Sequence, residues 1–334
     1  MRGYNIDQHC SGNTDLEYIF KKLGHELDID SLSGHSWVMG RERKSVPLVE
    51  NNIGSIVEKE IWREFYNTYA TRLEVYDFFL CFYPPVFALL YKEFTGKRVV
   101  VQIPVRYDFP YTDNEQSRKA LDDFLLSDQV IVTANNKLDK AYFEDRTGGG
   151  KECIYIPSLC EYTGMKYMPK RDEFLLYDGS RKWQIDNTVN RYDMHPHTWS
   201  DIQSFRGIIH IPYNFSTMSI FEQYTACIPL FVPSKDLLLK MHKQGMAALN
   251  ECFWSKTQNG KYGFDTIEDS LDLADYYSDA FPNIITFDNL AQLEDKMYDD
   301  AFLEWTSAEM VKDNMMNRRR VYKAWESVLE RVKK

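Results

Sequence analysis

The chain of 334 residues lacks any apolar run that approaches the roughly 18–20 residues needed to cross a bilayer. Its most apolar stretch, residues 78–91, is interrupted by Pro84 and Pro85 and predicts a strand, a turn and a buried helix. The N-terminal residues MRGYNIDQHC also lack the apolar core of a signal peptide. We therefore expect a cytoplasmic protein with no transmembrane segment.

Cysteine pairs and an excess of positive charge are missing as well. The six cysteines are scattered, without a CxxC pair or a tight cluster with histidine, and so predict reduced, buried thiols. The 40 Lys and Arg are outnumbered by 50 Asp and Glu, which gives a formal net charge of -10. This balance provides no general attraction to nucleic acid or to an anionic membrane, although a local basic pocket stays open. No G-x-G-x-x-G follows the first strand of either half, which disfavours a dinucleotide oxidoreductase.

The chain has enough length and apolar content for two domains, since 44% of its residues are hydrophobic and 15% are aromatic. Strand-like and helix-like segments alternate through the first half, which predicts a parallel sheet covered by helices on both faces. Ligands of such sheets bind at the carboxyl ends of the strands. The expected strands are residues 1–7, 78–82, 98–105, 129–134 and 153–157; a first helix is capped by Asn13 or Thr14 and ended by Gly24, and further helices are expected near 54–73, 85–94, 114–126 and 136–146.

One loop at these strand ends, residues 106–114, is unusually rich in charge and aromatic rings. This composition is typical of a binding surface, with a solvated surface loop as the alternative.

In the second half, a strand over residues 174–183 ends in Gly179 and Ser180, followed by Arg181 and Lys182. A turn of small residues exposes backbone N–H groups, and two adjacent cations offset phosphate charge, so this turn is a candidate phosphate site. A basic surface turn is the alternative.

The segment GIIHIPYNFSTMSIFEQYTACIPLFVPS, residues 207–234, predicts a second anion site. It contains a strand over 207–213, a polar loop, a helix over 217–226 that Ser216 or Thr217 caps, and a strand over 228–233. The free N–H groups and the positive dipole end of that helix favour an anion. Glu222 lies about one turn inside the helix, where its carboxylate can accept hydrogen bonds from a vicinal diol; we expect it to have no core partner.

The spacing Ser-x-x-Glu-x-x-x-Ala-x-x-Pro, from Ser219 through Glu222 and Ala226 to Pro229, resembles the donor-binding segment of GT-B glycosyltransferases, in the style of divergent viral or microbial members. Cys227 stands where that family usually has Gly. The resemblance implies that Glu222 holds the ribose of a nucleotide sugar, UDP-sugar favoured. It implies further donor contacts from Gly179, Ser180, Arg181 and Lys182 and from the loop residues Tyr213, Asn214, Ser216, Thr217, Met218 and Ser219.

The resemblance also implies the architecture, two Rossmann-like α/β domains with parallel sheets that face a cleft. The expected parts are an acceptor-side domain at 1–160, a linker at 161–172, a nucleotide-sugar domain at 173–310 and a C-terminal helix at 311–334 that returns to the first domain. That basic helix leaves a peripheral membrane contact open. The implied activity is transfer of a sugar to a hydroxyl of a glycan or glycoconjugate, in glycan biosynthesis, without a metal or other cofactor.

An inverting enzyme of this kind needs a general base on the first domain. His9 is the first candidate, because it follows the first strand and an imidazole has a suitable pKa. Asp108, Asp7 and Asp15 are the rivals, and Gly12, Arg106 and Tyr107 are expected on the acceptor side. Two other patterns are interpreted as structural: Asp28-Ile29-Asp30 as a strand end, and His195 and His197 as loop residues or contacts of a nucleotide base, on which Trp199 could stack. A nucleotide-sugar epimerase and a non-catalytic glycan-binding relic are the alternative functions.

Overall fold

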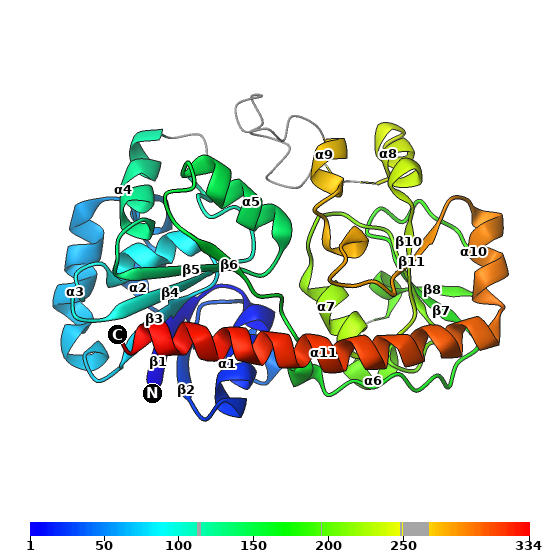
Figure 1. The fold of residues 1–334 in the computed structure, drawn as a ribbon, viewed down its shortest axis with the longest axis horizontal. Helices are drawn as coiled ribbons and strands as arrows, with labels where there is room; N and C mark the ends of the chain where they lie inside the picture. Colours follow the sequence, from blue (N-terminus) through cyan, green and yellow to red (C-terminus); the bar gives the residue numbers. More distant parts are fainter. Residues whose placement is uncertain (112–114, 195, 248, 250–266) are drawn as a thin grey trace. The chain divides into compact units, whose positions relative to one another are not determined.

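The computed structural model describes residues 1–111, 115–194, 196–247, 249 and 267–334 (Figure 1). The chain divides into two compact units, of which unit 1 is Met1–Ser158 with Val321–Lys334 and unit 2 is Leu159–Arg320. Each unit is built around a parallel sheet with helices packed on it. The predicted α/β fold class, with its two parallel sheets and its C-terminal helix, is confirmed.

Unit 1 contains a six-stranded sheet in the order β2-β1-β3-β4-β5-β6, in which every neighbouring pair is parallel. Its central strands read FFLC and VIVTA and are buried along their whole length, as expected for strands covered on both faces. The strands are β1 (Arg2–Asp7), β2 (Glu26–Ser31), β3 (Phe78–Cys81), β4 (Arg98–Ile103), β5 (Val130–Ala134) and β6 (Cys153–Tyr155).

The predicted helices of unit 1 occur in the predicted order, two of them differ from the prediction, and the short helices at 36–39 and 47–50 were not predicted. Helix α1 starts earlier than its predicted caps, because the side chain of His9 accepts a hydrogen bond from the backbone N–H of Gly12 and so caps the helix. The predicted helix at 85–94 is the 3-10 helix η3, Pro85–Tyr91. The others are α1 (Cys10–Lys22), η1 (Ser36–Met39), α2 (Pro47–Glu50), η2 (Ile53–Ser55), α3 (Lys59–Leu73), α4 (Glu115–Leu125) and α5 (Lys137–Arg146).

Unit 2 contains a five-stranded parallel sheet in the order β11-β10-β9-β7-β8. Its strands are β7 (Phe174–Tyr177), β8 (Thr188–Asn190), β9 (Ile208–His210), β10 (Leu230–Pro233) and β11 (Ile285–Phe287). The helices are η4 (Glu161–Thr163), η5 (Arg191–Asp193), α6 (Trp199–Ile202), α7 (Met218–Thr225), α8 (Lys235–Lys243), α9 (Ile267–Leu271), η7 (Asp275–Tyr277), α10 (Leu290–Met297) and α11 (Asp300–Val332), whose last part belongs to unit 1.

The segment 161–172 is tied to unit 2 by its backbone. Tyr167 donates to the carbonyl of Ala226 at 2.8 Å, and Lys170 donates to the carbonyl of Ser204 at 2.8 Å. At the other end of the chain, the last turns of α11 complete the core of unit 1. There Trp325 is fully buried and makes an edge-on ring contact with Phe20, with 5.2 Å between the ring centroids.

Both sheets reverse their strand order at one position. In unit 1 the chain runs from β1 to β2 on one side and then crosses to β3 on the other side of β1. In unit 2 it runs from β7 to β8 and then crosses to β9. Loops diverge on either side of such a reversal and leave a crevice at the carboxyl ends of the two strands, which is where open α/β sheets bind ligands. The candidate sites are therefore the strand ends of β1 and β3 and those of β7 and β9.

Gly12 gives a prediction for the β1–β3 end. A Cβ at this position would lie 2.0–2.6 Å from three ring carbons of Phe82, so α1 approaches that ring closely only because residue 12 has no side chain. We expect Gly12→Ala to lower the free energy of unfolding by about 1–3 kcal/mol, the usual cost of overpacking, although alanine is otherwise the better helix former. Urea unfolding measures the change. Gly54→Ala, where no atom lies within 4 Å of the added carbon, is the control; a Gly12→Ala protein as stable as the parent would contradict the prediction.

Candidate functional site

Unit 2 has a pocket of about 450 Å³ at the carboxyl ends of β7 and β9. It lies at the reversal of strand order, where the fold leaves room for a ligand. The pocket brings together two segments that the sequence indicates separately as anion sites, because its walls include Gly179, Ser180 and Lys182 from one and Tyr213 from the other. Tyr192, Gly245 and Ala247 also contribute to its lining.

The buried carboxylate of Asp178 shapes the turn that forms one wall of the pocket. One of its oxygens accepts hydrogen bonds from the backbone N–H of Ser180 at 2.9 Å and from the Ser180 hydroxyl at 2.6 Å. The other oxygen accepts from the backbone N–H of Trp183 at 2.9 Å. These bonds end strand β7 at Tyr177, well before the predicted strand end. Sequence reasoning missed Asp178, although an Asp directly before a Gly-Ser pair is a known turn signal.

The two cations of this turn point to different partners. Lys182 lines the pocket, and its ammonium group donates to the carbonyl of Gly245. Arg181 has a positive φ of 54° and forms an exposed ion pair with Asp193, 3.1 Å between nitrogen and oxygen. Its guanidinium also donates to the carbonyl of Tyr192 at 3.2 Å. Lys182 is therefore the cation that this turn offers to a ligand of the pocket.

Two tyrosines give the pocket wall both apolar faces and hydroxyl groups. Tyr213 is 47% exposed and Tyr192 is 37% exposed, which is unusual for large aromatic side chains in a folded core. Burial, the neighbouring Tyr192 and the more distant Glu222 carboxylate raise the pKa of Tyr213, while the Arg191 guanidinium opposes them. The Tyr213 phenol therefore stays protonated near neutral pH and can donate a hydrogen bond.

A stacked pair of rings lies at the strand ends next to this lining. Tyr177 and His210 occupy paired positions of β7 and β9, and their rings stack with centroids 5.3 Å apart at an interplanar angle of 14°. Burial lowers the pKa of His210 to about 4; the Gln223 side chain opposes this shift and Arg191 adds to it. Burial also raises the pKa of Tyr177 to about 12. His210 is thus neutral at pH 7.

Helix α7 keeps its predicted place, but its carboxylate is not without a partner. Glu222 is 8% exposed and accepts a hydrogen bond from the hydroxyl of Tyr162, so the expectation that it lacks a core partner is wrong. Tyr162 lies in the segment assigned to a linker, which sequence reasoning could not place beside α7. The Glu222 carboxylate also contributes to the raised pKa of Tyr213, which forms part of the pocket wall. To bind the diol of a ribose, the Glu222 carboxylate would have to exchange its bond from Tyr162.

The start of α7 is less regular than predicted. Thr217 occupies the N-cap position without a capping bond from its side chain, and its hydroxyl lies 3.0 Å from that of Ser219. The side chain of Asn214 accepts from the backbone N–H of Phe215 at 2.8 Å. Past the end of the helix, Cys227 has a positive φ of 60° in the position where the resembling family carries glycine. The turn therefore keeps the left-handed backbone that glycine favours.

In unit 1, His9 lies at the β1–β3 reversal. Its Nδ1 accepts from the backbone N–H of Gly12 at 3.3 Å, and its ring lies edge-on to Phe82 and Tyr83, with centroids 5.7 and 5.9 Å away. Burial lowers the pKa of His9 to about 4, so the imidazole is neutral at pH 7. The acceptor role of Nδ1 places the ring proton on the other nitrogen.

Asp7 is the structural carboxylate of this strand end. It is fully buried; one oxygen accepts from the backbone N–H of His9 at 2.7 Å, and the other accepts from those of Phe82 and Tyr83 at 3.1 and 2.6 Å. Burial raises the pKa of Asp7 to about 7, with the backbone donors opposing that shift. Asp15, the other nearby rival for a base, is also buried, at 1% exposure.

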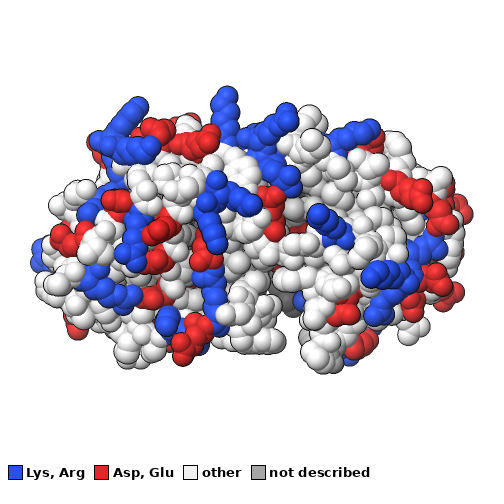
Figure 2. All heavy atoms as spheres, turned by 90° about the horizontal axis from the view of Figure 1, so that it is seen from below, with Lys and Arg blue, Asp and Glu red and all other residues white. Residues whose placement is uncertain are grey.

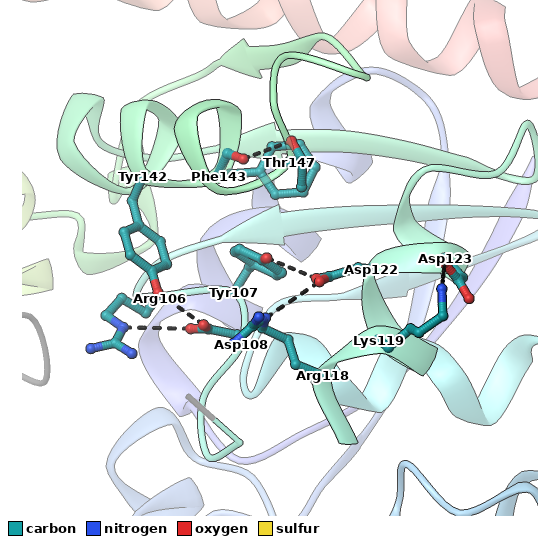
Figure 3. Close-up of polar contacts among 10 residues, drawn as sticks. All are labelled: Arg106, Tyr107, Asp108, Arg118, Lys119, Asp122, Asp123, Tyr142, Phe143 and Thr147. Carbon is teal, nitrogen blue, oxygen red and sulfur yellow. Dashed lines mark hydrogen bonds and ion pairs between the residues drawn. The ribbon is translucent and has the colours of Figure 1, made fainter. Parts of the chain in front are cut away.

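The charged loop after β4 turns inward. Arg106, Tyr107 and Asp108 are all at most 1% exposed, and Figure 3 shows Tyr107 joined to a side chain of α4 and Asp108 joined to one of α5. Asp108 pairs with Arg106 at 3.4 Å and accepts from the hydroxyl of Tyr142 at 2.9 Å. Tyr107 donates to Asp122 at 2.7 Å. These contacts anchor the loop, and Asp108 would reach a substrate as a base only if the loop opened.

The metal-like patterns have other partners. Asp28 accepts from Arg2 and Tyr76, and Asp30 accepts from Tyr4, within strand β2. His195 lies outside the described residues, and Nδ1 of His197 lies 2.7 Å from the carbonyl oxygen of Met194. Across the part of the chain that the structure describes, no three His, Cys, Asp or Glu side chains gather as a metal site.

Surface charge and apolar length add little to the site. On the face shown in Figure 2, Lys and Arg side chains alternate with Asp and Glu, so this face carries charge of both signs. None of the described helices combines the length and the apolar character required to span a bilayer.

No family model and no curated protein matches the sequence. Several solved glycosyltransferase structures are similar to it over nearly the whole chain. They include CalG4, the calicheamicin glycosyltransferase (12% identity, 99% of this chain and 98% of that chain, TM-score 0.46), SnogD from Streptomyces nogalater (12%, 98% and 99%, 0.49), and the spinosyn rhamnosyltransferase SpnG complexed with thymidine diphosphate (10%, 96% and 99%, 0.43).

The buried His210 gives a pH prediction. Its folded pKa of about 4 lies below the unfolded value near 6.5, so the unfolded chain takes up the proton first and stability is lost as the pH falls through this range. His210→Phe keeps a ring on Tyr177 but removes the ionisation. Between pH 7 and pH 5, we expect the free energy of unfolding to fall by about 2 kcal/mol less in the variant than in the parent. Denaturant unfolding of both proteins at both pH values measures this difference. An equal loss of unfolding free energy in the variant and the parent would contradict the prediction.

Proposed function

We propose that this protein is a glycosyltransferase that binds a nucleoside-diphosphate sugar, UDP-sugar favoured, in the pocket of unit 2. The observation that carries the proposal is the convergence of the Gly179–Lys182 turn and Tyr213 on one pocket at the strand reversal of a parallel sheet. The volume of about 450 Å³ is within the usual range for small-molecule sites. The pocket also offers one ammonium group and two tyrosine hydroxyls.

This combination suits a diphosphate. Glycosyl transfer leaves negative charge on the departing phosphate, and fixed donors that are already in place stabilise that charge best. Lys182 would exchange its carbonyl partner, Gly245, for a phosphate oxygen. The Asp178 carboxylate holds the turn in shape by accepting hydrogen bonds, so the turn needs no rearrangement when the ligand enters. We propose that the donor binds without a metal ion.

The exposed tyrosine faces suit the remainder of a nucleotide. An aromatic ring provides a surface on which any nucleobase can stack. Tyr192 and Tyr213 also carry hydroxyls that could bind ribose or phosphate oxygens. Glu222 would release the Tyr162 hydroxyl and accept hydrogen bonds from the ribose instead. Its carboxylate would thus be hydrogen-bonded both with and without the ligand.

His9 is proposed as the general base, in unit 1. It is neutral at pH 7, as a base must be, and it lies at the strand reversal of its own sheet. To accept a proton on the nitrogen opposite Nδ1, the ring must place its own proton on Nδ1, which breaks the bond from Gly12. The cap therefore competes with the base role, and the two can be separated by substitution.

The donor site predicts a difference between two neighbouring cations. Lys182→Ala should weaken UDP binding by about 1.5–3 kcal/mol, the range for a hydrogen bond to a charged group, while Arg181→Ala, which removes an exposed pair with Asp193, should weaken it less. Titration calorimetry in EDTA measures both. Binding of UDP that requires a divalent metal, or no binding at all, would count against the proposed site.

The proposed role of His9 predicts that its substitution changes turnover but not UDP affinity. His9→Ala and His9→Asn should each lower turnover by about 10²–10⁴-fold and leave UDP affinity nearly unchanged, because a positioned base contributes that much. Asparagine is a good N-cap residue, so His9→Asn should retain most of the thermal stability that His9→Ala loses. Turnover with a panel of nucleotide sugars and thermal unfolding are measured together. If the asparagine variant transfers sugar at the parental rate, His9 is a helix cap only.

A further inference from the structure

Helix α11 has one face that packs firmly on unit 2. Along residues 300–320, a residue of this inner face occurs every three or four positions, and each of these residues is at most 8% exposed. Asn314 donates to the carbonyl of Tyr224 at 2.9 Å, and Asp313 accepts from the hydroxyl of the same tyrosine at 2.9 Å. The buried positions are Leu303, Thr306, Met310, Asn314 and Asn317. These contacts fix which side of the helix faces outward.

The outward side carries large apolar side chains. Met316 is 64% exposed, Trp305 58%, Met315 52% and Val311 47%. Trp305 also stacks on Phe302, with 6.1 Å between the ring centroids. A solvent-facing helix side normally carries polar residues, and exposed apolar side chains gathered along one element indicate an interaction surface.

The later part of this outer side is basic, against the charge of the whole protein, whereas the part next to Trp305 carries Glu304 and Glu309. Residues 311–323 contain five basic side chains and one acidic one, whereas the chain carries a formal net charge of -10. All five basic residues are exposed: Lys312, Arg318, Arg319, Arg320 and Lys323. The single acid, Asp313, is held by Tyr224. Lys312 pairs with Glu309 and Arg318 with Glu161, so Arg319, Arg320 and Lys323 are the charges of this stretch that attract an anion.

We propose that the outer side of α11 rests on an anionic lipid surface. Apolar side chains that alternate with Lys and Arg along one helix side are typical of helices that lie in the membrane interface. Val311, Met315 and Met316 would enter the boundary between headgroups and acyl chains, and the long basic side chains would reach the lipid phosphates. The inner side stays packed on unit 2, so binding needs no unfolding. This contact is independent of the nucleotide pocket and of the proposed reaction.

Vesicle co-sedimentation of the full chain tests the proposal. The protein should sediment with vesicles of mixed phosphatidylcholine and phosphatidylserine, remain in solution with phosphatidylcholine alone, and be released by high salt, which screens the attraction. Met315→Ser with Arg319→Glu should reduce binding by at least about fivefold, since each basic residue near such a surface contributes on the order of 1 kcal/mol.

The matched control makes the same two changes elsewhere on unit 2. Met168→Ser with Lys170→Glu replaces an exposed methionine and an exposed lysine outside α11 and should bind like the parent. Arg319→Glu alone repeats the test if the double variant unfolds at a lower temperature. Parent protein that stays in solution, or an α11 variant that binds like the parent, would overturn the proposal. So would light scattering that shows self-association through α11 without vesicle binding, because a second copy would then cover this side.

Discussion

The reversal of strand order in each parallel sheet is the constraint on which both candidate sites depend. In unit 1 the chain leaves β1 for β2 and later returns to β3, and such a reversal is where open α/β sheets bind ligands. The same happens at β7 and β9 in unit 2, where the pocket lies. Polar and exposed aromatic groups collect at these ends because the sheet interiors are filled with apolar side chains.

Each reversal is held by a buried carboxylate that accepts backbone N–H groups. Asp7 at the end of β1 binds the N–H groups of His9 and Tyr83, so it ties the ends of two strands together. Asp178 after β7 binds two N–H groups of its own turn. A carboxylate accepts hydrogen bonds from several donors at once, and the low dielectric of the protein interior strengthens each of these bonds. Both sites thus contain a buried carboxylate that accepts backbone N–H groups. In unit 1 it connects two strand ends, and in unit 2 it holds a single turn.

Sequence patterns predicted the fold class and the segments of the pocket, because hydrophobic periodicity and turn composition are local properties. Lys182 and Tyr213 lie at strand ends that the alternation of strands and helices already indicated. What the sequence could not supply was the direction of side chains across long separations. The bond between Tyr162 and Glu222 joins residues far apart in the chain. Asp178 has a local signal, but its effect, an early end of the strand, depends on where its carboxylate points.

The loop after β4 illustrates the same limit. Its charge and aromatic content suit a binding surface as well as they suit an internal anchor, and composition alone does not distinguish these outcomes. The deciding partners come from later in the chain: Tyr142 on α5 donates to Asp108, and Asp122 on α4 accepts from Tyr107 (Figure 3). A buried arginine of this kind is held by several contacts at once, which makes the loop a fixed part of unit 1.

The return of α11 to unit 1 has a consequence for the order of events during synthesis. Domains usually fold as they emerge from the ribosome, with the N-terminal one first. Here the core of unit 1 contains Trp325, so residues 1–158 leave the ribosome with a gap beside Phe20 that nothing yet fills. Unit 2, translated later, has all its residues before Val321 appears. The unit that is made first is therefore the last to be finished, and a nascent chain carries an exposed apolar site in unit 1 until translation is almost complete.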